Sequence, residues 1–160
     1  MNAIDLLKSQ HRDVERLFSK IDNARGAKSK QTIFETLADS LAAHATIEEH
    51  QFYPAVRAKR TEDILLESLE EHLGIKRVLA DLLKISADDE TFDAKIKVLK
   101  EQVEHHVDEE ETDLFPKVKK ILDKAELEAL GETMSAEFKK LEAGRPRDAV
   151  PSETKQAASL

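Results

Sequence analysis

The chain has 160 residues, a length that fits one domain with a sizeable buried core. Charged residues make up 36% of it and glycine and proline contribute four residues each, which favours long helices over sheet. A net charge of −8 argues against a nucleic-acid partner, which needs a basic face, and the absence of cysteine excludes disulfides, thiolate metal sites and cysteine nucleophiles.

The chain shows no sign of a membrane partner. No stretch approaches the roughly 18 consecutive apolar residues that a membrane helix needs. The first residues, Met1 to Asp5, lack the basic-then-apolar layout of a secretory signal. We therefore expect a cytoplasmic protein.

Apolar residues recur at helical spacing in five stretches. They cover residues 4–21, 34–55, 65–83, 92–114 and 127–141. The links between the first four stretches are short, which predicts antiparallel neighbours. The expected fold is therefore all-α: an up-down-up-down four-helix bundle with an additional C-terminal helix.

Boundary signals divide the chain into three parts. Residues 1–122 form the predicted bundle, and residues 123–143 form an additional helix on or beside it, opened by a sequence resembling a capping box. Residues 144–160 turn to Arg-Pro-Arg, Pro-Ser and Ala-Ala-Ser, which predicts a flexible tail. The additional helix could cover the bundle, form a homodimer surface or attach a regulatory partner, and its residues do not decide between these roles.

One motif occurs twice. Each copy reads His-x-x-x-Glu-Glu, then two variable residues, an apolar pair and a proline, and the copies occupy residues 44–54 and 106–116. The closing proline removes a backbone donor and predicts a kink late in its helix. Another histidine, His11 or His72, precedes each copy by 33 or 34 residues.

Six polar side chains interrupt the apolar stripes of the predicted helices. They are His11, His44, Glu48, His72, His106 and Glu110. Burying each of them without a partner would cost on the order of a few kcal/mol. A histidine and a glutamate four residues apart share one helix face, and the six positions fall at the same depth of the bundle within about one turn. The pattern predicts a metal layer, and the alternative is a hydrogen-bonded polar core in a metal-free structural bundle.

The donor set limits the choice of metal. Imidazole and carboxylate without sulfur suit iron, manganese or zinc. Two carboxylates on facing helices can bridge two ions, as in the glutamate-rich di-iron bundles. Our assignment of the ligands is His11 and His44 to one ion, His72 and His106 to the other, and Glu48 and Glu110 as bridges.

These motifs resemble the hemerythrin family in its bacterial HHE cation-binding form, over about residues 1–122. The resemblance rests on Asp5-Leu6-Leu7-x-x-x-His11, on Glu71-His72 and on the two His-x-x-x-Glu-Glu copies with their prolines. It implies a four-helix bundle with two iron ions in a non-haem di-iron centre, bridged by carboxylates and by an oxo or hydroxo group.

The chain departs from the oxygen-carrying members of that family. Those members have a fifth histidine where this chain has Lys76, and their last carboxylate is an aspartate five residues after its histidine rather than a glutamate four after it. One fewer imidazole leaves an open position, which favours activation of a bound molecule over reversible carriage.

The resemblance to the four-histidine, two-glutamate subgroup implies small ligands, namely oxygen, peroxide or nitric oxide. Catalase-like peroxide removal is the enzymatic form of this function. The alternative is an iron- or oxygen-sensing or iron-storage module without turnover, so enzymatic activity stays open.

Other residues near the motif have two interpretations each. Tyr53, the one tyrosine, either packs in the core or acts as a phenolate ligand or hydrogen-bond donor in the vacant position. Lys76 either extends to the surface or pairs with a carboxylate near the site. Glu49, Glu109 and Glu111 form a hydrated acidic flank or supply alternative ligands.

Two histidines fall outside the predicted layer. His50 and His105 lie off the apolar stripes of their helices, so we expect both on the surface.

Overall fold

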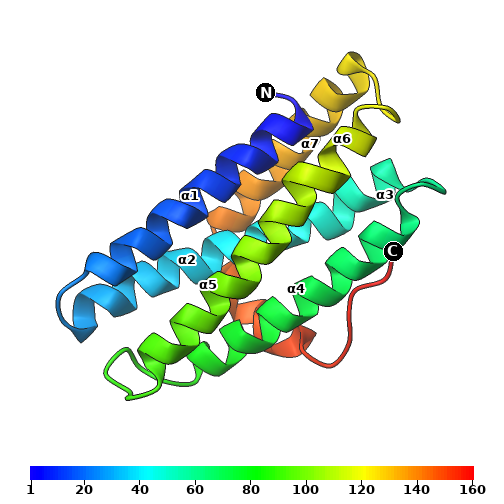
Figure 1. The fold of residues 1–160 in the computed structure, drawn as a ribbon. Helices are drawn as coiled ribbons and strands as arrows, with labels where there is room; N and C mark the ends of the chain where they lie inside the picture. Colours follow the sequence, from blue (N-terminus) through cyan, green and yellow to red (C-terminus); the bar gives the residue numbers. More distant parts are fainter.

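The computed structural model describes all residues 1–160, and four long helices form its body (Figure 1). They are α1 (Ala3–Asn23), α2 (Ala27–Ile47), α4 (Glu62–Leu83) and α5 (Phe92–Glu109). The predicted all-α bundle is confirmed. No helix combines the length and the apolar character that a membrane crossing requires.

The bundle consists of two helical hairpins, α1 with α2 and α4 with α5. Asn2 caps α1 by accepting a hydrogen bond from the Asp5 amide. Gly26 links α1 to α2 at φ 87°, a left-handed conformation that glycine adopts without steric cost. The short links make each pair antiparallel, as the sequence indicated.

The two repeated motifs each contain a π-helical turn. The turns are η1 (Glu48–Phe52) after α2 and η2 (Glu110–Leu114) after α5, and the one-turn helices α3 (Tyr53–Val56) and α6 (Phe115–Val118) continue from them. The Tyr53 amide donates to the carbonyl of Glu48 five residues earlier, and Phe115 does the same to Glu110. The predicted irregularity therefore takes the form of a widened turn before each proline.

The apolar core has two parts on either side of the polar layer. The first, towards the ends of the bundle where the hairpins turn, includes Phe18, Phe34 and Phe92. The second, towards the other end, includes Leu7 and Phe52. A set of buried polar side chains separates the two.

The additional helix is α7 (Lys124–Glu142), which packs against α1 and α2. Asp123 and Glu126 form its capping box, because each side chain accepts a hydrogen bond from the other residue's amide. In Figure 1 α7 lies behind α1, away from α4.

The C-terminal segment departs from the expectation of a flexible tail. Residues Pro146–Glu153 form a 3-10 helix, η3, that contacts both α2 and α4. Val150 is fully buried in the first core cluster, and the Arg147 guanidinium pairs with Asp39 of α2. Val150, the Arg147–Asp39 pair and further contacts with α2 and α4 therefore fix a segment whose composition is that of a mobile tail.

Gly131 lets the start of the chain approach α7. A Cβ atom at this position would lie 2.7 Å from the carbonyl carbon of Asn2, and the carbonyl oxygen of Met1 lies closer still. We expect Gly131→Ala to destabilise the fold by about 1–3 kcal/mol, because backbone atoms cannot yield as side chains do. Thermal unfolding measures the change, and Gly144→Ala is the matched control because the nearest atom there lies 3.6 Å away. Equal stability of the two variants would contradict the close packing.

Candidate metal centre

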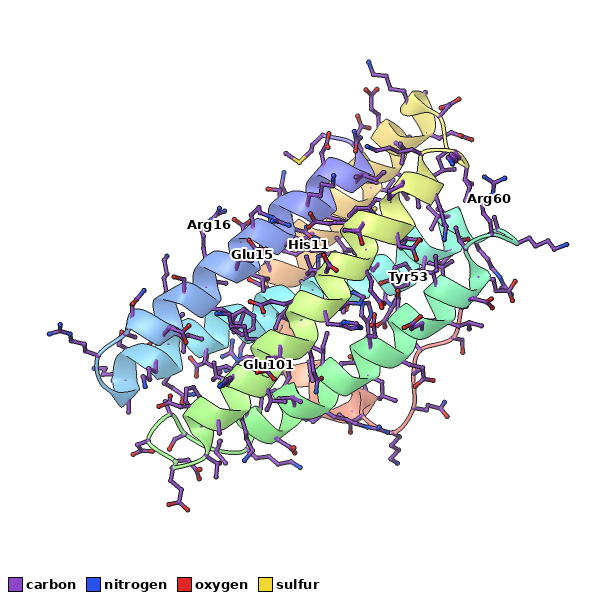
Figure 2. The ribbon with its side chains drawn as sticks, in the orientation of Figure 1. His11, Glu15, Arg16, Tyr53, Arg60 and Glu101 are labelled. Carbon is purple, nitrogen blue, oxygen red and sulfur yellow. The ribbon has the colours of Figure 1, made fainter.

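The structure brings the six predicted ligands into one layer across the bundle. All of them are buried: His11 of α1, His44 of α2, Glu48 of η1, His72 of α4, His106 of α5 and Glu110 of η2. Figure 2 shows His11 and Tyr53 directed into the space between the helices, whereas Arg16 and Arg60 point outward. The layer thus collects donors from both hairpins.

The donor atoms form two groups that share a carboxylate. One group contains His11, His44, Glu48 and Glu110, and the other contains Glu48, His72 and His106. Within each group the donor atoms lie within 4.8 Å of one another. Each group could therefore hold a cation, with Glu48 common to both.

Each glutamate lies between the two pairs of histidines. Glu48 places one oxygen 3.0 Å from Nε2 of His44 and the other 2.9 Å from Nε2 of His72. Glu110 Oε1 lies 3.2 Å from Nε2 of His11 and 3.4 Å from Nε2 of His106. Both carboxylates therefore span the layer from one hairpin to the other.

Several of these atoms have no hydrogen-bond partner within the protein. The buried Nε2 atoms of His11 and His44 are unsatisfied, as are the Oε1 atoms of Glu48 and Glu110, because their mutual contacts are not aligned as hydrogen bonds. Unsatisfied buried polar atoms are costly and rare in folded proteins. Nitrogen and oxygen donors that converge in this way fit a cation such as iron, manganese or zinc.

Two acidic residues hold histidines of the opposite hairpin. Glu49 Oε2 lies 2.7 Å from Nδ1 of His72, and Glu111 Oε2 lies 2.7 Å from Nδ1 of His11. Both residues follow directly after a glutamate of the layer. They act as hydrogen-bond acceptors around the layer, and neither of the two interpretations from the sequence describes that role.

Two further acceptors hold histidines within the same hairpin. Gln10 Oε1 lies 2.7 Å from Nδ1 of His44, and Glu71 Oε1 lies 2.8 Å from Nδ1 of His106. Neither residue had a predicted role, although Glu71 is part of the family resemblance and both residues directly precede a histidine of the layer, at equivalent places in the two halves of the chain. An acceptor on Nδ1 fixes the tautomer and turns the Nε2 lone pair towards the metal position.

The charge of the layer favours bound cations. Five carboxylates lie in or beside the layer, namely those of Glu48, Glu49, Glu71, Glu110 and Glu111. Two cationic side chains pair with them: Lys76 lies 3.0 Å from Glu49, and Arg12 pairs with Glu111. With neutral imidazoles this leaves three negative charges, most of them buried. Lys76 is itself buried, so of its two interpretations the structure supports pairing with a carboxylate.

Tyr53 reaches the centre of the layer. Its hydroxyl lies 3.0 Å from Glu110 Oε2, 3.1 Å from Glu48 Oε2 and 3.2 Å from Nε2 of His72. A regular α-helix would place a residue five positions along about 140° from Glu48. The wider π-turn brings Tyr53 back to the same side. In the second motif Phe115 takes this position and stacks on His11.

Mutual contacts decide the protonation of the buried groups. Burial acts against protonation of His106, but Glu110 and Glu48 outweigh it and raise its pKa well above the usual value. The pKa values of His11 and His72 are also raised, since neighbouring carboxylates again outweigh burial. For Tyr53 burial acts in the opposite sense, because it disfavours the charged phenolate and so raises the pKa well above its usual value. Glu110 and Glu48 raise that pKa further. The phenol therefore remains a proton donor.

The remaining histidines lie outside the layer, as predicted. His50 is 64% exposed and pairs with Glu137 of α7, and His105 is 63% exposed. His105 contacts Glu71 and Glu109 at the surface. Glu109 therefore belongs to the exterior of the protein.

Comparison with known proteins agrees with this arrangement. A family model described as the hemerythrin HHE cation binding domain matches residues 2–118. The chain belongs to this family. The match covers both hairpins and all six predicted ligands, so the hemerythrin-like bundle and its capacity to bind cations follow for this chain.

One solved structure and one sequence relative match most of the chain. The crystal structure of a hemerythrin HHE cation binding domain-containing protein from Mycobacterium kansasii, an Rv2633c homolog, superposes with a TM-score of 0.79 at 28% identity, covering 98% of this chain and 94% of that one. The uncharacterized protein Rv2633c of Mycobacterium tuberculosis is 29% identical over 143 residues, 88% of each chain.

A third relative is much longer than this chain. A DNA nickase from Nostoc sp. is 30% identical over 128 residues, which are 80% of this chain. This chain spans only 36% of that protein's length.

Raised histidine pKa values make metal binding depend on pH. Protons on His11, His72 and His106 must leave before a cation binds, so we expect metal affinity to rise with pH through the raised pKa values. Competition with a chelator between about pH 6 and 8 measures this, with roughly a tenfold gain per pH unit for each proton displaced. An affinity that does not change with pH would contradict the geometry.

Proposed function

We propose that this chain is a non-haem di-iron protein that reacts with oxygen, peroxide or nitric oxide, with catalase-like removal of peroxide as its turnover reaction. The observation that carries the proposal is the pair of donor groups that share Glu48. Four imidazoles and two carboxylates without sulfur suit iron, and the family match supports a cation in this layer.

Bound iron would supply Lewis acidity and electrons for the reaction, and the protein supplies the surroundings. Four histidines present Nε2 inward because acceptors hold every Nδ1. The six side chains of the layer are almost completely buried, which limits their contact with bulk water. Such a site strengthens electrostatic contacts and protects reactive species from side reactions.

The two halves of the layer differ in a way that favours chemistry on the α4 side. Tyr53 stacks on His72 with ring centroids 5.5 Å apart, whereas apolar Phe115 stacks on His11. Lys76, also on α4, replaces the additional histidine of the oxygen carriers. Tyr53 contacts Nε2 of His72, and Lys76 pairs with Glu49, which holds Nδ1 of the same histidine. Both differences therefore fall on the His72 side of the layer, where the phenol offers a proton donor to a small molecule.

DNA nicking is not part of this proposal. The chain covers about a third of the Nostoc relative, so that name describes a longer protein. A net charge of −8 also disfavours a nucleic-acid partner.

Iron content and peroxide turnover test the proposal together. We expect two irons per chain in protein from its native host, and many equivalents of peroxide converted to oxygen and water, measured with an oxygen electrode. His44→Ala removes one donor and should lower both values, whereas His50→Ala, at an exposed histidine, should lower neither. Two irons without turnover would favour the sensing or storage alternative. Absence of iron from the native protein would contradict the redox function.

Tyr53→Phe tests the proton donor separately from the metal. Phenylalanine keeps the ring, as Phe115 does at the equivalent position, but removes the hydroxyl that faces Glu48 and Glu110. Losing one positioned donor costs about 1–3 kcal/mol, so we expect peroxide turnover to fall roughly 10- to 100-fold with iron content unchanged. An unchanged rate would remove Tyr53 from the reaction. Loss of iron, together with a visible absorption band present only in the native protein, would indicate a phenolate ligand instead.

A further inference from the structure

A small apolar cavity adjoins the metal layer on the side of the first core cluster. It has a volume of about 30 Å³, which is room for one water-sized molecule. Apolar side chains of the four long helices make up most of its wall, and the four histidines of the layer also line it. The cavity therefore ends directly at the predicted ligands.

One residue of the cavity wall does not come from the bundle. Val150 belongs to η3 and is fully buried, whereas every other lining residue lies on α1, α2, α4 or α5. Because η3 contacts both α2 and α4, it covers the line along which these helices face each other. The four helices leave the cavity beside the histidines, and Val150 covers it from the outside of the bundle.

Polar contacts with α2 and α4 hold η3 in place. The Arg147 amide donates to Asp39 at 3.1 Å, and the Arg147 guanidinium pairs with the same carboxylate. Lys76 lies 3.8 Å from Glu153 at the end of η3, and just beyond η3 Arg77 donates to the Thr154 carbonyl at 3.0 Å. Beyond η3, Ala157, Ala158 and Leu160 pack against the second core cluster, so Val150 and the Arg147–Asp39 pair are the contacts that hold η3 itself over the cavity.

We propose that Val150 is the size filter of this cavity and that η3 is its cover, held in part by the Arg147–Asp39 pair. The cavity admits uncharged molecules of about the size of water or a diatomic gas, because its wall is apolar and only one such molecule fits. Bulkier molecules enter the cavity only when η3 moves away from α2 and α4. The filter is a property of the packing and does not depend on which cation occupies the layer.

Xenon binding tests the filter without any reaction at the metal. Xenon is an apolar probe that enters cavities of sufficient size, and methyl NMR shifts of Leu41, Ile75 and Leu79 would report its arrival in the zinc-loaded protein. Val150→Ala enlarges the cavity and should tighten xenon binding about tenfold. Val118→Ala is the matched control, since Val118 is fully buried in the second core cluster, outside the cavity. Equal xenon affinity in the two variants would overturn the proposal.

The preference of the iron-loaded protein for a small peroxide over a bulky one tests whether η3 covers the cavity. We expect the native protein to react with hydrogen peroxide much faster than with tert-butyl hydroperoxide. Arg147→Ala should reduce this preference about tenfold and increase hydrogen exchange of residues 146–153, because it frees η3 from Asp39. Arg145→Ala is the control, since Arg145 is exposed and pairs only with Asp148.

The two experiments separate this inference from the proposed function. Tighter xenon binding in Val150→Ala supports the filter even if the iron-loaded protein consumes no peroxide. Faster hydrogen exchange in Arg147→Ala with an unchanged peroxide preference would overturn η3 as the cover.

Discussion

The structure depends on one constraint: a layer of buried ionisable side chains cuts the apolar core in two. In most four-helix bundles the same positions carry leucine or isoleucine, which require no partner. Here the donors face one another, and four atoms at the centre have no hydrogen bond. Bound cations would satisfy those atoms and balance the negative charge. The helices must therefore align their hydrophobic registers so that the polar residues meet at a single depth.

Hydrogen-bond acceptors around the layer orient its histidines. Each histidine of the layer has an acceptor on Nδ1, and three of the four acceptors are carboxylates. Gln10 is the exception, so His44 has a neutral partner where His106 has Glu71. A carboxylate partner makes an imidazole a stronger donor to a metal than an amide does. The two halves of the layer therefore differ in the partners of their histidines as well as in the tyrosine that contacts His72.

The sequence predicted most of the bundle because local rules determine it. Helical periodicity located the four helices, and a histidine with a glutamate four residues later identified the side chains that interrupt the stripes. The capping residues of α1 and α7 also follow from short-range rules.

Features that depend on tertiary contact were not predictable in the same way. The π-turns add one residue to a helical turn, which a fixed period of 3.6 residues does not represent. The hydrogen bond between Glu71 and His106 could be predicted only from the register between α4 and α5. The position of η3 rests largely on Val150, one apolar residue in a polar segment, and composition could not separate it from a mobile tail.

The correspondence between the two hairpins has a consequence for how such a centre can arise. Glu49 of the first hairpin supports His72 of the second, and Glu111 of the second supports His11 of the first, so the support is exchanged in both directions. A contact in which each partner offers the same surface is what two-fold symmetry produces. Two identical copies of either hairpin, assembled around a two-fold axis, would hold four histidines and two bridging glutamates. A chain of half this length therefore carries enough information to build the centre as a homodimer, and covalent fusion then allows the halves to diverge at positions such as Tyr53 and Phe115.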